Sequence, residues 1–362
     1  MICPKCGAEG AAKNGNGRAR CIVGGHTFAL PVASLTQPDN LPDGVKLRGT
    51  STLTDLRTGE TVMQWVKTTA DAEAQRKAFE AAVAAMGEKL PREKPRKAPA
   101  ACNADLLNQY TITDYHLGML AWGEETGADW DIGIAEQLLV DWFAAAIAQA
   151  PAAAVGVFAQ IGDFLHWDGM DAVTPAHKHL LDADTRFQKL VRVAIRVIRR
   201  VIGMLLDKHQ AVHVVIAEGN HDPASSIWLR EWLAAIYEDE PRVTVDVSPD
   251  PYYCVEHGDT ALFYHHGHKR KPADIDTVFA AKFREVFGRT KHAYAHMGHM
   301  HHVDIKETNL MIVEQHRTLA APDAYASRGG WMSGRDAQVI TYHRRHGEVG
   351  RVRVSPQMLE AA

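Results

Sequence analysis

The stretch Ala211-Val-His-Val-Val-Ile-Ala-Glu-Gly-Asn-His-Asp222 carries the features that decide the fold. Its first seven residues are mostly apolar and β-branched, which is typical of a buried strand. A glycine, an amide, an imidazole and a carboxylate follow at 219–222. Open α/β sheets build ligand sites at such strand ends. The stretch therefore predicts an α/β domain with a site at one edge of its sheet.

Four further stretches place potential ligands directly after an apolar strand pattern. They are Asp114-Tyr-His-Leu-Gly118, Gly162-Asp-Phe-Leu-His166, His265-His-Gly-His268 and Gly298-His-Met-His301. Each alone is weak evidence, because Gly-Asp can be only a turn and a histidine-rich loop can bind metal adventitiously. Eight of the 20 histidines lie within 265–302, which is too dense for core histidines. The five stretches together, in order and at strand ends, indicate one site.

Helix and strand patterns alternate around these stretches. Helices are expected at Ile132–Gln149, Pro175–Lys208 and Pro223–Tyr237, and strands at 111–113, 154–161, 211–217, 243–247, 252–256 and 260–264. This alternation predicts an α/β domain with mixed sheets. The longest uncharged run, 142–161, is rich in alanine and interrupted by Pro151. We interpret it as a helix end, a break and a strand, and we expect no membrane span.

The five motifs resemble those of the calcineurin-like metallophosphoesterase superfamily, which run Asp-x-His, Gly-Asp, Gly-Asn-His-Asp/Glu, His-Gly and Gly-His-x-His. The resemblance spans 114–301 and implies a four-layer αββα sandwich with a dinuclear metal centre at its strand ends. It implies one metal bound by Asp114, His116, Asp163 and His301, and a second bound by Asp163, Asn220, His266 and His299. It also implies that His221 is catalytic and that Asp222 orients it. Asp, His and Asn ligands favour manganese, with iron or zinc as alternatives.

Two of the motifs are similar to the branch of that superfamily that contains the double-strand-break repair nucleases. They are Asp-x-His-Leu-Gly at 114–118 and Gly-Asp-x-x-His at 162–166. In that branch the residue matching His166 reaches toward the scissile phosphate; a surface histidine, or one beside the metal ligands, is the alternative. Asp168 falls out of register with the second carboxylate of many members. His266 is preferred to His265 because it directly precedes Gly267.

The N-terminus carries a second candidate metal site. Cys3-Pro-Lys-Cys6 has the C-x2-C spacing that places two thiolates on one turn. It resembles the zinc ribbons of transposase-type and phage DNA-handling proteins, although their second C-x2-C is absent. Cys21 and His26 are expected to complete a structural zinc site, and a reduced knuckle without metal is the alternative. Its lysines and arginines favour nucleic acid, while a solvated basic face or a protein-docking ribbon is also open.

Composition and charge suggest how the chain is divided. Residues 1–100 carry 15 Lys and Arg against 10 Asp and Glu, whereas 101–362 carry 25 against 34. We expect a zinc-ribbon-like module at 1–30, a linker with a β-hairpin and a helix at 31–100, a metallophosphoesterase domain at 101–350 and a tail at 351–362. The segment 90–100, rich in Pro, Lys and Arg, is expected to be a stiff linker. The sequence shows no secretory signal pattern and is expected to be cytoplasmic.

The function expected from these features is metal-dependent hydrolysis of phosphate esters. The favoured substrate is a phosphodiester in nucleic acid, preferably DNA. A small-molecule phosphomonoesterase or a cyclic-nucleotide phosphodiesterase is the enzymatic alternative. A nucleic-acid-binding scaffold with a degenerate site is the other alternative, but the intact Asn220, His221 and Asp222 argue against it.

Overall fold

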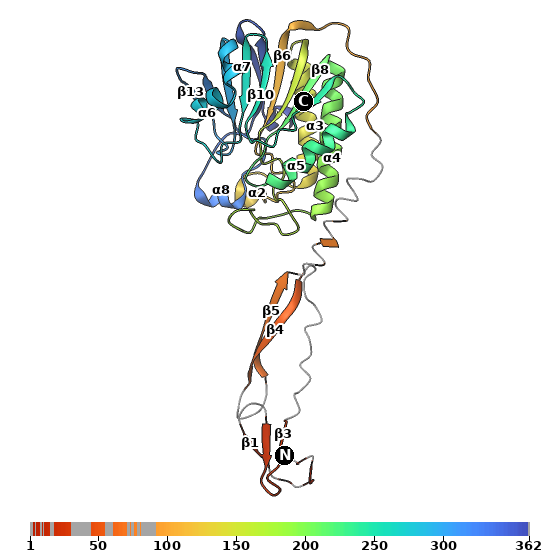
Figure 1. Cartoon of the computed structure of the whole chain (residues 1–362), viewed down its shortest axis with the longest axis vertical. Helices are drawn as coiled ribbons and strands as arrows, with labels where there is room; N and C mark the ends of the chain where they lie inside the picture. The colour runs from red at the N-terminus through yellow and green to blue at the C-terminus, as the bar shows by residue number, and fades with distance from the viewer. Residues whose placement is uncertain are drawn as a thin grey trace. The chain divides into compact units, whose positions relative to one another are not determined.

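A computed structural model describes residues 3, 5–7, 9, 11–14, 18–29, 45–54, 61–70, 73, 76–77, 80 and 92–360. The chain divides into two compact units, Met1–Arg76 and Lys77–Ala362. The second unit is called the main body below. It holds all five strand-end motifs, and its elements are shown in Figure 1.

Two β-sheets form the centre of the main body. The first has the order β16-β15-β6-β7-β8-β9, with parallel pairing from β6 to β9. Its strands are β6 Asn103–Ile112, β7 Ala153–Gln160, β8 Ala211–Ile216, β9 Val243–Val245, β15 Ala337–His343 and β16 Gly347–Val354. The second has the order β10-β11-β12-β14-β13, and β11, β12 and β14 are parallel. Its strands are β10 Tyr253–His257, β11 Thr260–Tyr264, β12 His292–Met297, β13 Asp304–Glu307 and β14 Ile312–Gln315.

Three apolar clusters join four layers in the order helix, sheet, sheet, helix. One cluster lies between the sheets and includes Leu107, Val157 and Leu262. A larger cluster packs α3 Ile132–Gln149, α4 Phe187–Lys208 and α5 Pro223–Ile236 on the first sheet. The third packs α6 Ile275–Lys282 and α7 Arg284–Arg289 on the second sheet. The four-layer αββα sandwich is therefore confirmed. Burial on both faces explains why β7 and β8 are almost continuously apolar.

Two expected boundaries in this body are wrong. The long helix begins at Phe187 instead of Pro175, because 173–186 form a loop with short bridges and turns. Leu180, in the middle of this loop, is 89% exposed. The first strand is also longer than expected, since β6 starts at Asn103. Three short helices complete the body: α2 Gly123–Thr126, α8 Ala324–Gly329 and α9 Pro356–Glu360.

The two ends of the main body differ from the expected linker and tail. Residues 92–99 contact the body instead of only spanning to it. Glu93 accepts a hydrogen bond from Arg199 of α4 at 3.0 Å, and the main-chain N–H of Arg96 donates to Glu240 at 2.7 Å. Residues 351–354 lie inside β16 and 356–360 form α9, so the expected tail is part of the fold.

The N-terminal unit contains two small antiparallel sheets. Strands β1 Ala11–Asn14, β2 Arg18–Cys21 and β3 Thr27–Ala29 form the first. The expected hairpin is present as β4 Val45–Thr54 and β5 Thr61–Ala70. Within the expected linker at 31–100, residues 31–44 and most of 71–86, where the helix was expected, lie outside the described residues. Within that helix, Glu73, Arg76, Lys77 and Glu80 are helical.

One helix in the described part of the chain, α3, is long and apolar enough by length and composition to cross a membrane. Its buried side includes Leu139, Trp142 and Phe143, which belong to the core cluster over the first sheet. A helix that packs into a core in this way passes the same test as a membrane span.

Candidate metal centre

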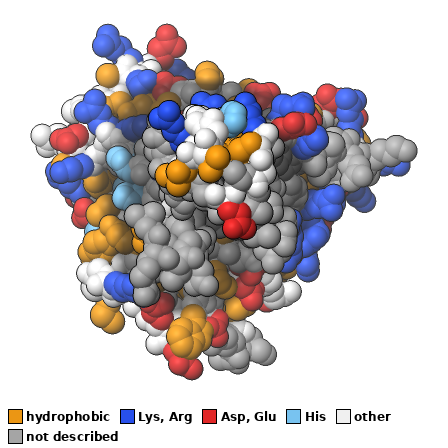
Figure 2. Space-filling model, turned by 90° about the horizontal axis from the view of Figure 1, so that it is seen from below, with side chains coloured by type: hydrophobic (Ala, Val, Ile, Leu, Met, Phe, Trp, Pro, Cys, Tyr) orange, Lys and Arg blue, Asp and Glu red, His pale blue; other side chains and the backbone are white. Residues whose placement is uncertain are grey.

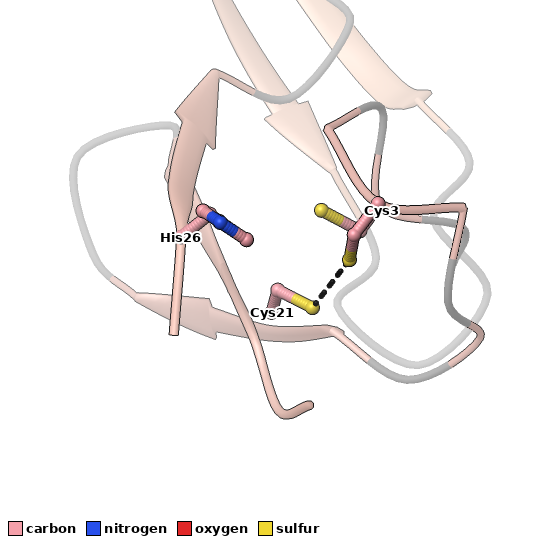
Figure 3. A group of neighbouring side chains, drawn as sticks. Cys3, Cys21 and His26 are labelled. Atoms are coloured by element: carbon pink, nitrogen blue, oxygen red, sulfur yellow. Dashed lines mark hydrogen bonds between the residues drawn. The ribbon is translucent and has the colours of Figure 1, made fainter. Parts of the chain in front are cut away.

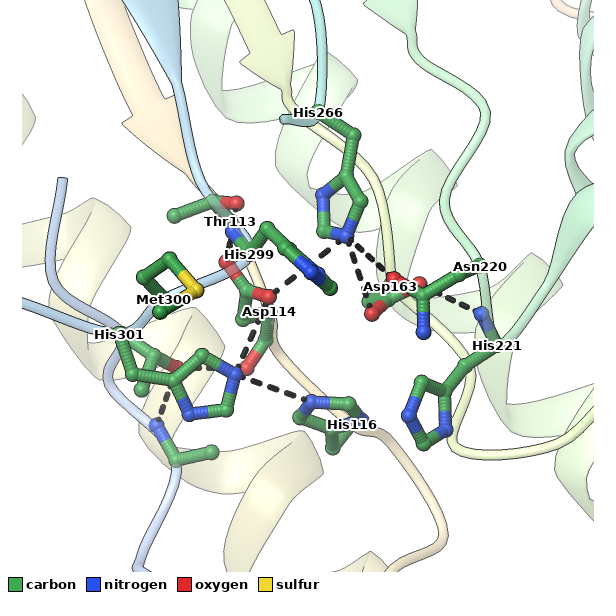
Figure 4. A network of polar contacts seen from close by, with 12 residues as sticks. Thr113, Asp114, His116, Asp163, Asn220, His221, His266, His299, Met300 and His301 are labelled. Atoms are coloured by element: carbon green, nitrogen blue, oxygen red, sulfur yellow. Dashed lines mark hydrogen bonds and ion pairs between the residues drawn. The ribbon is translucent and has the colours of Figure 1, made fainter. Parts of the chain in front are cut away.

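The carboxyl ends of β6, β7, β8, β11 and β12 converge at one edge of the two sheets. Parallel pairing within each sheet makes this possible, because successive parallel strands end on the same side. Figure 4 shows the side chains from these five strand ends directed toward one another. They are Asp114, His116, Asp163, Asn220, His221, His266, His299 and His301, so the structure gathers every metal ligand that the sequence predicted.

One group of donors is formed by Asp114, His116 and His301, whose ligand atoms lie within 4.8 Å of one another. His301 Nε2 is 3.1 Å from Asp114 Oδ1 and 3.4 Å from His116 Nε2. The other carboxylate oxygen, Asp114 Oδ2, accepts hydrogen bonds from Thr113 Oγ1 at 2.6 Å and from the His299 main chain at 2.8 Å. These two bonds fix the carboxylate so that Oδ1 faces the imidazoles.

A second group is formed by Asp163, His266 and His299 in the same way. His266 Nε2 lies 3.1 Å from Asp163 Oδ2 and 3.2 Å from the amide oxygen of Asn220. The opposite nitrogen, His266 Nδ1, donates to the Ile161 carbonyl at 2.8 Å, which fixes the ring. His266 Nε2 is also 3.9 Å from Asp114 Oδ1, so the two groups are adjacent.

Five of these residues have left-handed backbone conformations, which residues other than glycine rarely adopt. The φ angles are +50° at Asp114, +47° at His116, +52° at Asp163, +74° at His299 and +56° at His301. Each such residue costs on the order of 1–3 kcal/mol, and such strain gathers at functional sites. The surrounding fold therefore holds the donors in these positions at the expense of stability.

Two glycines make room for this arrangement. A Cβ at Gly219 would overlap the Asp163 carboxylate, and a Cβ at Gly298 would overlap Thr113 Oγ1. Close approach of the backbone to a ligand site is a common reason for glycine. The glycines of Gly-Asn-His-Asp and Gly-His-x-His are thus required by their close packing against the carboxylates and Thr113, since neither has a left-handed φ angle.

The electrostatics of the centre are those of two buried anions among imidazoles. Burial would raise the pKa of Asp114 and of Asp163, but the nearby histidines outweigh it and hold both below their ordinary values. Burial would lower the pKa of His266, yet the two carboxylates raise it to about 10. In contrast, burial holds the pKa of His116 well below its usual range, so its ring is neutral. The groups that lower the pKa of the two carboxylates most are histidines, His301 and His266 foremost.

This donor set fits divalent cations. Asp114 Oδ1 is buried and accepts no hydrogen bond among the described residues. His116 and His301 face each other nitrogen to nitrogen at 3.4 Å, and so do His116 and His166 at 3.2 Å. Facing lone pairs need a proton or a cation between them, and histidine, carboxylate and amide donors suit Mn, Fe or Zn. A cation at His266 would take the place of its proton.

The expected role of Asp222 as the partner of His221 is wrong. Asp222 instead accepts hydrogen bonds from the main-chain N–H groups of Asp163 at 3.2 Å and Leu165 at 3.0 Å. His221 Nδ1 lies 2.8 Å from the main-chain carbonyl of His166. That carbonyl can only accept, so Nδ1 carries the hydrogen and Nε2 is left to the site. Asp222 therefore shapes the turn that carries Asp163, and the backbone of His166 orients His221.

The remaining candidates fall outside the two donor groups. His166 is buried, with its Nδ1 3.2 Å from His116 Nδ1, so it is not a surface histidine. His265 stacks on Tyr252 at 4.6 Å and its Nδ1 accepts from Gly267 N, which leaves His266 as the histidine in the centre. Asp168 accepts from Ala224 N and Ser225 N, at the start of α5.

Two residues that support the centre were not predicted from the sequence. Thr113 donates to Asp114 Oδ2, and Thr318 Oγ1 donates to the Asp114 carbonyl at 2.6 Å. Thr113 could have been found from its place between the strand and the aspartate. Thr318 carries no signal, because it is 204 positions from Asp114 and follows β14, an element with no motif.

In the N-terminal unit, Cys3, Cys6, Cys21 and His26 form one cluster, with their ligand atoms within 4.8 Å of one another. Figure 3 shows side chains of this cluster directed toward a common point. Cys6 Sγ and Cys21 Sγ are 3.6 Å apart, and the Gly24 N–H, 3.3 Å from Cys21 Sγ, lowers the pKa of that thiol. A Cβ at Gly24 would meet the His26 ring at 2.5 Å, so the position that lacks a cysteine admits the histidine.

Comparison with known proteins adds only remote structural neighbours. No protein-family model and no curated protein matches the chain. A solved archaeal phosphodiesterase is 13% identical, covers 68% of this chain and 99% of its own, and has a TM-score of 0.35. A predicted phosphoesterase from Streptococcus pneumoniae is 10% identical, with 70% and 99% covered and a TM-score of 0.30. Vps29 of Entamoeba histolytica, solved in complex with zinc, is 12% identical. The match covers 68% of this chain and 98% of Vps29, with a TM-score of 0.29.

Proposed function

We propose that the chain is a metal-dependent phosphoesterase that binds two divalent cations at the edge of its two sheets. The observation that carries this proposal is the pair of adjacent donor groups around Asp114 and Asp163. Asp163 has one oxygen toward His266 and the other toward the main chain of His221, and it is our candidate for the bridging carboxylate. The first cation would be bound by Asp114, His116, Asp163 and His301, and the second by Asp163, Asn220, His266 and His299.

Two bound cations would neutralise phosphate charge and lower the pKa of a water nucleophile. The protein residues perform the other tasks. His221 carries hydrogen on Nδ1, and its partly exposed ring can present Nε2 to a substrate oxygen. An imidazole in that position can stabilise developing charge or donate a proton to the leaving oxygen near neutral pH. His166, stacked 5.6 Å from His221, supports that ring and is our second candidate for phosphate contact.

We favour manganese for the centre, with iron or zinc as alternatives, on the mixture of imidazole, carboxylate and amide donors. We favour a structural zinc for Cys3, Cys6, Cys21 and His26, because three thiols and one imidazole suit tetrahedral zinc. The apolar core beside that cluster contains only Cys3, Ala19, Cys21 and Phe28 among the described residues. So small a core needs a metal to hold it together.

The substrate that we favour is a phosphodiester in nucleic acid, preferably DNA. The basic composition of residues 1–100 and the short motifs around Asp114 and Asp163 support it, the latter only by analogy. A small phosphomonoester or a cyclic nucleotide is the competing substrate, and the N-terminal ribbon is also open to a protein partner. A degenerate scaffold is disfavoured, because His221 and both donor groups are intact.

One experiment separates these substrates. The metal-reconstituted protein is assayed with manganese on bis(p-nitrophenyl) phosphate, p-nitrophenyl phosphate, a cyclic nucleotide, and single- and double-stranded DNA. Hydrolysis of the bis-ester and of DNA, with little hydrolysis of the mono-ester, is expected. Preference for the mono-ester or the cyclic nucleotide would overturn the substrate class, and no hydrolysis of any ester would overturn the enzyme assignment.

A further inference from the structure

Exposed aromatic side chains gather on one edge of the main body. Four aromatic residues in the described part of the chain are more than half exposed, and three of them lie on or beside α2 and α8. They are Trp122 at 60%, Tyr325 at 72% and Trp331 at 58%, and we call them the aromatic rim. The fourth, Trp65, belongs to the N-terminal unit. Large aromatic surfaces left open to water in this number mark a binding surface.

The rim is attached directly to the backbone that carries two of the expected metal ligands. The segment that contains α8 begins at Thr318, which donates to the carbonyl of Asp114. It ends at Arg335, whose guanidinium lies 5.5 Å over the Trp130 ring. Trp130 Nε1 in turn donates to the His116 carbonyl at 3.4 Å. Both ends of the segment are thus fixed next to the metal centre.

The two halves of the rim are held together. Glu125 of α2 pairs with Arg328 of α8 at 2.7 Å, and its carbonyl accepts from Ser327 Oγ at 2.8 Å. The rings of Tyr325 and Trp331 are in edge contact at 4.9 Å. Figure 1 shows α2 and α8 side by side at the lower edge of the body, and Figure 2 views the molecule from below, with hydrophobic and charged side chains interspersed. The rim is therefore a preorganised aromatic surface.

Positive charge lies on α4, on the other side of the loop 114–122 that carries Asp114 and His116. Lys189, Arg192, Arg196 and Arg200 are exposed on α4 at spacings of three or four residues, which places them on one face. Successive members of this basic ridge are about 4.5–6 Å apart along the helix axis. Arg196 pairs with Glu136, whereas the other three have no carboxylate partner in the part of the chain that the structure describes. The ridge faces solvent and suits a row of phosphates.

The ridge begins beside the metal centre. The Gly118 carbonyl, two residues after His116, accepts from Asp184 N at 2.9 Å just ahead of α4. A Cβ at Gly118 would come within 2.8 Å of Leu190, in the first turn of that helix. The middle of the loop 114–122 thus packs against the first turn of α4, the turn that carries Lys189, and the loop ends at Trp122 of the rim.

We propose that this surface binds single-stranded nucleic acid, with unpaired bases stacked on the aromatic rim and phosphates along the basic ridge. Base–aromatic stacking combined with a positively charged track is how proteins bind single strands without reading sequence. A duplex is disfavoured, because its bases are already stacked and paired. The proposal rests on the proposed function, which supplies the centre where the scissile phosphate is held.

The test compares a dT oligonucleotide with an abasic oligonucleotide of the same length, which keeps the phosphates and removes the bases. Binding to the full-length protein is measured by fluorescence anisotropy over a range of salt. Trp331→Ala and Tyr325→Ala should each weaken dT binding roughly tenfold or more, and should affect the abasic strand much less. Trp331→Phe should restore most of the loss, which separates stacking from misfolding. Met358→Ala, an exposed apolar residue on α9, is the control.

The ridge is tested with Lys189→Ala/Arg192→Ala. Removing two phosphate contacts should reduce the slope of log K against log salt by about 1.4 for a single strand. Arg289→Ala/Lys291→Ala, at the opposite end of β12, should leave the slope unchanged. Equal losses on dT and abasic strands, or tighter binding of a duplex, would overturn the proposal. If bis(p-nitrophenyl) phosphate is not hydrolysed by the parent, the proposed function fails instead.

Discussion

Oδ1 of Asp222 accepts a hydrogen bond from the main-chain N–H of Asp163 at 3.2 Å. The other oxygen accepts from Leu165 N, so one carboxylate closes the turn after β7. Asp163 has φ = +52° in that turn. This strained conformation persists only where surrounding residues hold it in place, as the hydrogen bonds to Asp222 do. The last residue of Gly-Asn-His-Asp therefore stabilises Asp163, a proposed metal ligand that follows a different strand.

Asp222→Asn should consequently impair metal binding more than the acid–base step. The amide can accept only one of the two main-chain N–H bonds and leaves the other buried donor unpaired. We expect a loss of bound metal, measured by elemental analysis after reconstitution, together with lower stability. If the variant retained both ions and lost only rate, Asp222 would act on His221 after all.

Asp168 provides a matched control for this substitution. It also accepts two main-chain N–H bonds, from Ala224 at 2.6 Å and Ser225 at 2.7 Å, but these belong to the first turn of α5. Asp168→Asn should lower the free energy of unfolding by about 1 kcal/mol, as loss of a helix cap does, without lowering the metal content.

Asp163→Ala tests the dinuclear assignment itself. As the proposed bridge, Asp163 would contribute to both ion sites, so its removal should abolish turnover and lower the metal content by more than one ion per chain. The comparison is His299→Ala, which removes a ligand from one site only. Two ions per chain and normal turnover in Asp163→Ala would contradict the assignment.

His221→Ala should separate chemistry from metal binding. The main-chain N–H of His221 binds Asp163, whereas its ring contacts the His166 carbonyl, stacks on the His166 ring and meets the His116 ring edge-on at 4.7 Å. Truncating the ring should lower kcat on the order of 10²-fold or more, the scale of a general acid or base, with metal content retained. A variant as fast as the parent would remove His221 from the mechanism.

The sequence predicted the strand ends well, because a motif with candidate metal ligands directly follows each of these strands. β7, β8 and β11 lie within one or two residues of their expected limits, and the donors of all five motifs come together. The loop at 173–186 was missed because its leucines imitate a helical face, and only tertiary contacts show Leu180 to be exposed. The partner of Asp222 was missed for a similar reason, since a carboxylate beside a histidine in sequence need not contact it.

The N-terminal cluster should bind one zinc that is independent of the catalytic metals. Cys6→Ser should lower zinc content by one per chain and leave the metal content of the centre unchanged. Deleting residues 1–30 should keep hydrolysis of bis(p-nitrophenyl) phosphate within about twofold, because the metal centre lies wholly in the other unit. Loss of that activity would show that the ribbon belongs to the catalytic machinery.

The buried carboxylate of Glu314 should make the stability of the fold depend on pH. It is buried at the end of β14, where Arg351 binds both of its oxygens at 2.8 and 3.0 Å and His316 Nδ1 is 3.6 Å away. Burial would raise the pKa of Glu314, but His316 and Arg351 outweigh it and lower the pKa to about 2. An unfolded glutamate titrates near 4.3. The pair therefore stabilises the fold fully above about pH 4.3, and the stabilisation is lost as the pH falls toward 2.

Glu314→Gln should accordingly reduce the free energy of unfolding by roughly 3 kcal/mol at pH 7, as expected for a broken buried ion pair. The difference from the parent should shrink between pH 4.3 and 2, measured by denaturant unfolding followed by tryptophan fluorescence. Glu348→Gln removes the other, more exposed carboxylate of Arg351 and should cost about 1 kcal/mol or less. A difference for Glu314→Gln that stays constant from pH 7 to 3 would show that the effect is one of packing and not of charge.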